Sequence, residues 1–194
     1  FHLLKDIIHY AEIKAKKKNK SIRFSIPTNT TLLNDNIIKY IRKHSIHISL
    51  SIDGTAFSQN NRKTIIGKNS FSLVMENLER IKKVYKNKLP AIRKTITPEN
   101  VGHLFKDIHF FVNNGFHAIA FSPAMNFSWP KEKLKVFESE QIRLAEFWID
   151  SLIKDTLLFF QTWSDLFVFM EIKNHKYFSL PDTFFCGAGS YMVA

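Results

Sequence analysis

The chain has 194 residues, of which 45% are hydrophobic, and its 28 lysines and arginines outnumber 17 aspartates and glutamates to give a net charge of +11. The single cysteine excludes an internal disulfide framework and indicates a reducing, cytoplasmic compartment, and no apolar run approaches the roughly 20 residues that span a membrane. The basic charge raises the question of an acidic partner. The lysines are spread over several predicted helices and cluster only at residues 14–20, which does not favour nucleic acid.

Neither end of the sequence has the features of a natural boundary. The chain begins at Phe1, without a methionine and inside an apolar-periodic run, and it stops in what resembles a starting strand after Tyr191. We therefore expect an internal piece of a longer protein, inactive by itself.

Helix and strand patterns alternate along the first 154 residues. Helical spacing of apolar residues is found over 1–19, after Asn34 and after Ser70, both of which suit an N-cap, after Thr97 and over 137–154. Alternation of apolar and polar residues, typical of strands with one buried face, is found over 22–29, 46–52, 91–97 and 118–122. Strict alternation of this kind predicts parallel strands joined by right-handed crossover helices.

The strand faces distinguish an open sheet from a barrel. One face of successive strands is polar or small, with His47, Ser49 and Ser51, then Arg93, Thr95 and Thr97, then Ala118, Ala120 and Ser122. A doubly wound sheet buries both faces and is apolar throughout. The sequence therefore predicts an α/β fold, a partial (β/α) barrel of parallel strands with outer helices and a polar interior.

Residues suited to a helix start and a helix end mark both ends of the predicted helix after Thr97. Thr97, Pro98 and Glu99 suit its cap, first position and first turn. Gly115 suits the position that ends it.

The strand over 46–52 ends in Asp53-Gly54, at the point where α/β barrels place their chemistry. Ser51-Ile52-Asp53-Gly54, followed by Asn61-Arg62, resembles the fourth-strand motif S-[IL]-D-G and N-R of radical S-adenosylmethionine (radical SAM) proteins of the SPASM-containing group. That group includes sulfatase-maturing enzymes and peptide maturases.

Four further segments resemble the same group in the same order. Residues 28–33 are similar to its third-strand T-N-G-T-L-L segment, with Thr30 in place of the glycine. Residues 95–100 resemble its fifth strand and helix start, residues 119–123 its sixth strand, and Cys186-Gly187-Ala188-Gly189 the C-x-A-G that opens the SPASM region.

The resemblance implies an enzyme in which a reduced [4Fe–4S] cluster cleaves S-adenosylmethionine and the 5′-deoxyadenosyl radical abstracts a hydrogen atom from the substrate. Ser51 would bind the methionyl carboxylate or nearby polar groups, Arg62 would offer a charge-assisted partner, and Asp53 has the alternative role of shaping the turn. Cys186 would ligate an auxiliary [4Fe–4S] cluster. The full cofactor-binding set that it implies is Thr28, Asn29, Ser51, Asp53, Arg62 and Ser122.

The resemblance also implies a division of the chain and a substrate. Residues 1–154 would form the radical SAM partial barrel without its first strands, 155–182 a linker or bridging helix, and 183–194 the start of the SPASM region. The C-x-x-x-C-x-x-C loop of the catalytic cluster would precede Phe1. The substrate would be a ribosomal peptide or protein side chain, with or without a leader peptide.

Two other functions are compatible with a basic α/β chain. An aldolase-type or phosphate-binding (β/α) barrel without iron would need a glycine-rich phosphate loop, or a catalytic lysine or carboxylate at a strand end, and we identify neither. A binding module would use the basic surface to hold an acidic peptide or nucleic acid, with salt-dependent affinity.

Overall fold

The computed structural model describes residues 1–62, 69–86 and 88–163. The chain divides into two compact units, Phe1–Thr162 and Trp163–Ala194. Apart from Trp163, the second unit lies outside the described residues, and so do Cys186, the predicted SPASM start at 183–194 and most of the predicted bridge at 155–182.

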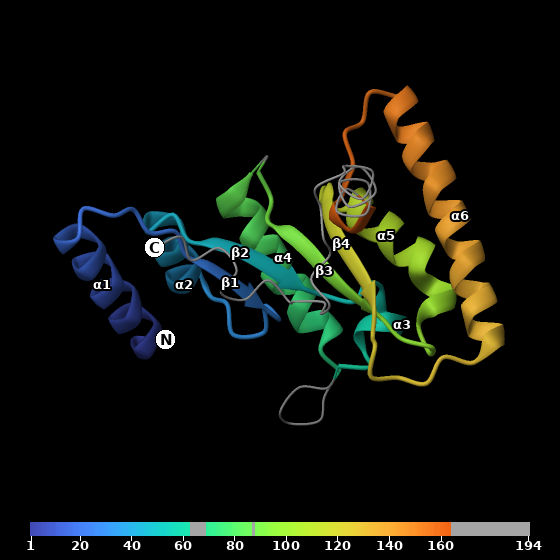
Figure 1. Ribbon diagram of the computed structural model, residues 1–194, viewed down its shortest axis with the longest axis horizontal. Coiled ribbons are helices and arrows are strands. Elements are labelled where there is room, and N and C mark those ends of the chain that lie inside the picture. Colours follow the sequence, from blue (N-terminus) through green and yellow to red (C-terminus); the bar gives the residue numbers. More distant parts are fainter. Residues whose placement is uncertain (63–68, 87, 164–194) are drawn as a thin grey trace, which may run out of the picture. The chain divides into compact units, whose positions relative to one another are not determined.

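The first unit alternates helices and parallel strands (Figure 1). Its helices are α1 (His2–Lys17), α2 (Asp35–Lys43), α3 (Ala56–Gln59), α4 (Phe71–Tyr85), the 3₁₀ turn η1 (Val101–His103), α5 (Leu104–Asn113) and α6 (Lys131–Ile153). Its strands are β1 (Ser25–Thr28), β2 (His47–Ser51), β3 (Ala91–Ile96), β4 (Ala118–Pro123) and β5 (Phe159–Phe160). The described strands form a sheet in the order β1-β2-β3-β4-β5, and all neighbours are parallel.

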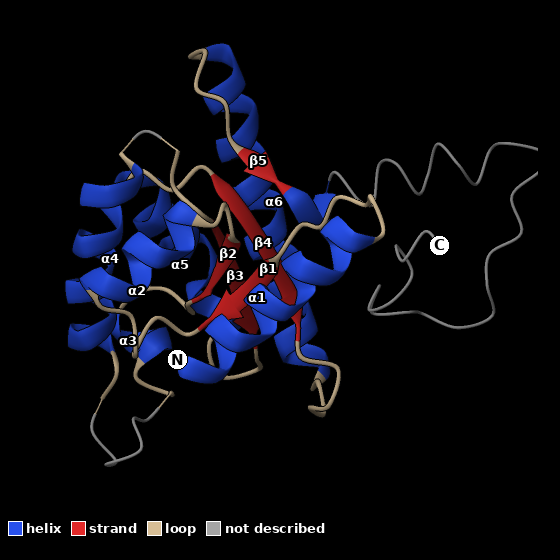
Figure 2. Cartoon of the chain, turned by 90° about the vertical axis from the view of Figure 1, so that its left-hand side faces the viewer, coloured by secondary structure: helices blue, strands red, loops and turns tan. Residues whose placement is uncertain are grey.

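Helices α2, α4 and α5 lie together on one side of this sheet (Figure 2). The strand residues that face them are apolar and buried, as Ile48 and Leu50 of β2 and Ile92 and Ile96 of β3 illustrate. Alternate residues on the other face are exposed or half-buried, including Arg93. The predicted α/β fold of parallel strands with outer helices is therefore confirmed.

The strand register brings the carboxyl ends to one edge of the sheet. Arg93 pairs with Ala120 and Ile96 with Pro123, so β3 and β4 end side by side. At the outer end of the sheet, Pro27 of β1 pairs with Ser49 of β2. The loops that follow the strands therefore converge on one side of the molecule.

Two predicted helix boundaries are confirmed. The Asn34 side chain accepts a hydrogen bond from the backbone N–H of Ile37 at 3.0 Å and so caps α2. Gly115 has a φ of +85° immediately after α5, a conformation that a side chain disfavours.

The predicted helix start at Thr97 is wrong. The Asn100 side chain accepts from the N–H of Thr97 at 2.8 Å, and the N–H of Asn100 donates to the carbonyl of Thr97 at 3.2 Å. These bonds close a tight turn around Pro98 and Glu99, so the 3₁₀ turn begins only at Val101.

Helix α4 begins directly after Ser70, as predicted, although the Ser70 side chain makes no capping hydrogen bond. Two other boundaries differ from prediction. Helix α6 begins at Lys131, earlier than predicted, directly after Pro130. The sheet continues past residue 154, because the two residues of β5 pair with Ala118 and Ile119 of β4. No described helix is long and apolar enough to cross a lipid bilayer.

Candidate functional site

A pocket of about 350 Å³ lies at the carboxyl ends of the strands. Its lining comes from the loop after β2, the end of β3, the turn that follows it and the loop after β4: Asp53, Asn61, Arg62, Thr95, Thr97, Glu99, Asn100 and Phe127. We call this the carboxyl-end pocket.

Asp53 and Arg62 form the charged centre of the carboxyl-end pocket. Arg62 donates from Nε to Asp53 Oδ2 at 2.5 Å and from Nη2 to Oδ1 at 2.8 Å, a bidentate ion pair. Asp53 is only 5% exposed and also accepts from the N–H of Thr95 at 3.3 Å. The pair therefore ties the end of the loop after β2 to the strand ends.

The same loop is held at its base by Gln59. The N–H of Asp53 donates to Gln59 Oε1 at 2.9 Å, and Gln59 Nε2 donates to Ser70 Oγ at 2.9 Å. Ser70 Oγ in turn donates to the Gln59 carbonyl at 3.2 Å, which explains why it does not cap α4. Both amide atoms of the buried Gln59 are thus satisfied.

A buried ion pair lies beneath this loop. Lys94 of β3 and Asp107 of α5 have no exposed side-chain surface, and their charged atoms are 2.8 Å apart. Lys94 also donates to the Asp53 carbonyl at 2.6 Å. Asp107 accepts from the N–H and the hydroxyl of Thr55, both at 2.8 Å, and from the hydroxyl of Ser58 at 2.5 Å.

Burial lowers the pKa of Lys94, and the charge of Asp107 opposes that shift. A buried ion pair of this kind stabilises a fold only when its remaining donors and acceptors are satisfied. Here the additional bonds to the Asp53 carbonyl, Thr55 and Ser58 meet that requirement. The pair fixes the turn at Asp53 to the second layer of the fold.

Gly54 is the position where this turn approaches Asp107. It has a φ of +130°, and a Cβ atom there would lie 2.3 Å from the Asp107 carboxyl carbon. Glycine is therefore required twice, by the backbone conformation and by the space. This is a physical reason for the Asp-Gly sequence that goes beyond turn chemistry.

The loop after β1 contains a residue under conformational strain. Thr30 has a φ of +68° and is fully buried, and its hydroxyl has no hydrogen-bond partner in the described structure. Its carbonyl accepts from Asn77 Nδ2 of α4 at 2.9 Å. A β-branched residue in the left-handed region is unfavourable. The position at which the sequence departs from the glycine of the motif that it resembles is therefore one where glycine would fit the backbone.

Glu99 is an exposed acidic residue that also lines the carboxyl-end pocket. A hydrogen bond from the Thr97 side chain lowers its pKa, and a backbone bond adds to the effect.

The six predicted cofactor-binding residues all lie at the carboxyl edge of the sheet. Asp53 and Arg62 contact each other and line the carboxyl-end pocket. Thr28 and Ser51 are the last residues of β1 and β2, and Ser122 lies near the end of β4.

Asn29 and Thr28 use their side chains locally. Asn29 Oδ1 accepts from the N–H and hydroxyl of Thr31, and Thr28 Oγ1 accepts from the N–H of Thr30. Of the six predicted residues, Asp53 and Arg62 are therefore in direct contact, and the other four lie at the same edge.

Sequence reasoning missed Lys94 and Asp107. A signal existed, because each occupies a position on an otherwise apolar face: Lys94 between Ile92 and Ile96 on the strand, and Asp107 between Leu104 and Phe111 at helical spacing. A charge at such a position in a folded protein requires a partner.

The described residues contain no group of three His, Cys, Asp or Glu side chains placed to hold a metal ion. The predicted iron–sulfur ligand, Cys186, lies outside them. Two buried oxygen atoms without partners, on Thr30 and on Asn60 beside Arg62, are compatible with a polar ligand at this edge.

No family model matches the chain. A cysteine-type anaerobic sulfatase-maturating enzyme of Clostridium novyi (strain NT) is 24% identical over 173 residues, which are 84% of this chain and 45% of that protein. The structure of native anSMEcpe with bound AdoMet has a TM-score of 0.76 at 21% identity. The structure of native anSMEcpe with bound AdoMet and Cp18Cys peptide has a TM-score of 0.75 at 20% identity.

Each of these two structures covers 91% of this chain, and the chain covers 50% of each of theirs. The chain therefore spans about half the length of the proteins that it matches. At this identity the structural likeness establishes the fold. The chain resembles the sulfatase-maturing radical SAM/SPASM proteins in both sequence and fold, as its motifs predicted.

Proposed function

We propose that the full-length protein is a radical SAM enzyme of the cytoplasm that modifies a ribosomally made peptide or a protein side chain. The observation that carries the proposal is the coincidence of motif and site: Asp53, Asn61 and Arg62 of the motif line the carboxyl-end pocket, in a fold that resembles that of the AdoMet-bound anSMEcpe structures. The bound peptide in another anSMEcpe structure supports a peptide or protein substrate.

In this proposal S-adenosylmethionine, bound to a reduced [4Fe–4S] cluster, supplies the radical that abstracts hydrogen. The described residues bind and orient the cofactor. Ser51 ends β2 and Ser122 lies near the end of β4, whereas Thr28 ends β1, the neighbour of β2, and Asn29 follows it. Cys186 would ligate an auxiliary cluster.

The geometry refines the roles of Asp53 and Arg62. Because Nε and one N–H of Nη2 of Arg62 are bonded to Asp53, a cofactor carboxylate would meet the guanidinium at Nη1 and at the second N–H of Nη2. Asp53 then acts as a positioning residue that holds the guanidinium in place. The buried Lys94–Asp107 pair keeps Asp53 itself in position through the Asp53 carbonyl.

The test uses the protein encoded by the complete open reading frame, reconstituted with iron and sulfide without oxygen. We expect a C-x-x-x-C-x-x-C loop upstream, the absorption of [4Fe–4S] clusters, and release of 5′-deoxyadenosine from S-adenosylmethionine. A protein that binds no iron and releases no 5′-deoxyadenosine would contradict the proposal.

Matched variants locate the cofactor. Loss of one hydrogen bond to a charged group costs about 1.5–3 kcal/mol, so Ser51→Ala and Arg62→Gln should each weaken S-adenosylmethionine binding by roughly tenfold or more. Ser139→Ala and Arg80→Gln change the same residue types on exposed helix surfaces and should leave binding unchanged. This placement of the cofactor would be contradicted if Ser139→Ala weakened binding as much as Ser51→Ala, and Arg80→Gln as much as Arg62→Gln.

A further inference from the structure

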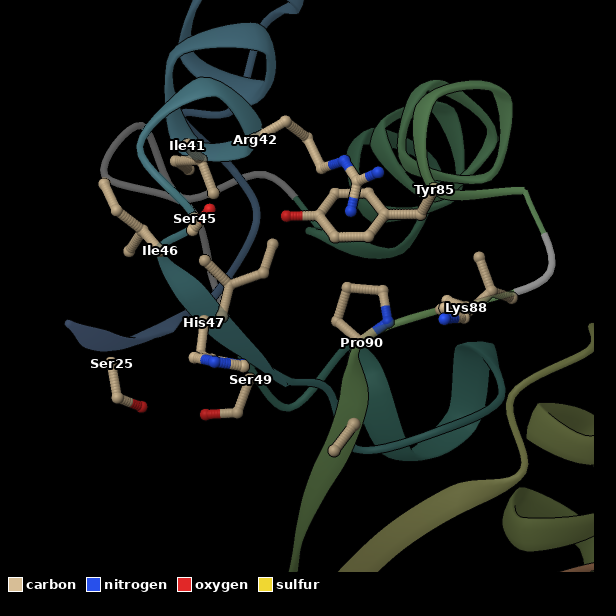
Figure 3. Close-up of a pocket in the computed structure, with 13 residues that line it drawn as sticks. Ser25, Ile41, Arg42, Ser45, Ile46, His47, Ser49, Tyr85, Lys88 and Pro90 are labelled. Atoms are coloured by element: carbon tan, nitrogen blue, oxygen red, sulfur yellow. The ribbon is translucent and has the colours of Figure 1, made fainter. Parts of the chain in front are cut away.

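A second pocket lies at the opposite, amino ends of the strands. Its volume is about 650 Å³, within the range of small-molecule sites. The first residues of β1, β2 and β3 form its floor, and the last turns of α2 and α4 form its wall (Figure 3). We call it the amino-end pocket.

The charge on the amino-end pocket has one sign. Arg42 of α2 and Lys88 before β3 line it together with His47, and none of the described lining residues carries a carboxylate. In the described part of the chain, neither Arg42 nor Lys88 forms an ion pair. Two cations without counter-charges at one pocket favour an anionic ligand.

A buried hydroxyl group adds a specific donor. The Tyr85 oxygen is buried, yet it has no hydrogen-bond partner in the described structure. The Arg42 guanidinium lies 4.9 Å from the centre of the Tyr85 ring, and the phenol oxygen points toward Ser45 and Ile46 (Figure 3). A buried O–H without an acceptor is unfavourable, so a ligand oxygen placed there would relieve that cost.

The remaining lining has an apolar part. Ile46, Ile48 and Pro90 lie on the pocket wall. A ligand with an organic body as well as an anionic group would fill this space, whereas a bare inorganic ion would contact only the polar side.

From these observations we propose that the amino-end pocket binds a small organic phosphate monoester. The phosphate carries a charge of about −1.5 to −2 near neutral pH, which matches Arg42 and Lys88 together. One phosphate oxygen accepts from the Tyr85 hydroxyl, and the organic part packs on Ile46 and Pro90. The proposal is independent of the proposed function, because it concerns the opposite ends of the strands and requires neither iron nor S-adenosylmethionine.

Titration calorimetry of the full chain with phenyl phosphate tests the proposal, with inorganic phosphate and benzyl alcohol as part-ligands. We expect phenyl phosphate to bind and to raise the melting temperature, and both part-ligands to bind at least about tenfold more weakly. Absence of phenyl phosphate binding at millimolar concentration would overturn the proposal. So would equal affinity for either part-ligand.

Single variants separate a built site from diffuse attraction to a basic protein. Arg42→Gln and Lys88→Gln should each weaken phenyl phosphate binding by about tenfold, and Tyr85→Phe by several-fold. Lys43→Gln is the matched control, since Lys43 follows Arg42 on α2 but does not line the pocket. An equal loss in Lys43→Gln and Arg42→Gln would overturn the proposal. Circular dichroism of each variant confirms that weaker binding does not reflect unfolding.

Discussion

Two buried polar side chains at opposite ends of the sheet, Lys94 and Tyr85, differ in whether they have partners. At the carboxyl ends, Lys94 and Asp107 are completely buried and the structure provides partners for both charges. At the amino ends, the Tyr85 hydroxyl is buried without a partner. A satisfied polar network fixes one geometry, whereas an unsatisfied group gains from an added partner. The turn at Asp53 is therefore fixed by the chain itself, whereas the Tyr85 hydroxyl is the group to which the proposed ligand would add a partner.

Removing one member of the buried ion pair should have the largest effect. Asp107→Ala leaves Lys94 charged, buried and without its carboxylate, and should lower the free energy of unfolding by about 3–5 kcal/mol. Denaturant unfolding measures this change. The double variant Lys94→Met/Asp107→Leu should be clearly more stable than Asp107→Ala, because no unpaired charge remains. A double variant that is less stable than the single one would show that the pair does not account for the loss.

Gly54→Ala tests the close approach beneath the carboxyl-end pocket. The new methyl group would overlap the Asp107 side chain in a backbone conformation that L-residues disfavour, so we expect a loss of about 2–4 kcal/mol. Gly102→Ala is the control, because the nearest side-chain atom there is at an ordinary contact distance of 3.7 Å. Thermal unfolding compares the two. Similar losses would mean that glycine is not specifically required at position 54.

Thr30→Gly should stabilise the protein by about 1 kcal/mol. It removes the cost of a left-handed threonine and of an unpaired hydroxyl, which together exceed the entropy that glycine loses on folding. Thr30→Val keeps the branched side chain at positive φ and removes only the hydroxyl group. Comparing the three unfolding free energies separates the two terms. A destabilised Thr30→Gly protein would indicate that packing of the Thr30 methyl group dominates.

The smallest effect concerns the amino end at alkaline pH. Burial raises the pKa of Tyr85, and the nearby Arg42 opposes the shift. Above pH 10 the unfolded chain therefore loses this proton before the folded chain, which lowers stability as pH rises. Between pH 9 and pH 11 the free energy of unfolding of Tyr85→Phe should fall less than that of the unchanged protein, and the difference should be below about 1 kcal/mol. Tyr10→Phe, on an exposed tyrosine of α1, is the control. An unchanged slope in Tyr85→Phe would contradict the assignment.

The sequence predicted the features that depend on near neighbours. Apolar and polar residues alternate every two positions in β2, so the strand, its buried face and its end at Asp53 could be placed. The cap at Asn34 and the glycine after α5 are chemical signals of the same local kind.

Prediction from the sequence was wrong or incomplete where a side chain took the place of a backbone hydrogen-bond partner, and where two side chains from different elements bind each other. Thr97 and Pro98 have the chemistry of a helix start, but the Asn100 side chain takes the N–H of Thr97 and closes a turn instead. Lys94 and Asp107 belong to different elements, and only the packing of α5 on β3 joins them. The two residues of β5 are too few to show periodicity. The carboxyl-end pocket could therefore be located from the sequence, but not the network that supports it.

The outer strand β1 has a consequence for the behaviour of the chain in solution. The N–H of His47 donates to Phe24, so Phe24 and Ile26 turn their backbone toward β2, whereas Ser25 and Pro27 turn theirs toward the open edge. Proline has no N–H to offer to an incoming strand, which is how natural sheets discourage edge-to-edge association. Pro27 thus leaves this side of β1, in the described sheet, without a hydrogen-bond donor at that position, and a replacement such as Pro27→Val would add one.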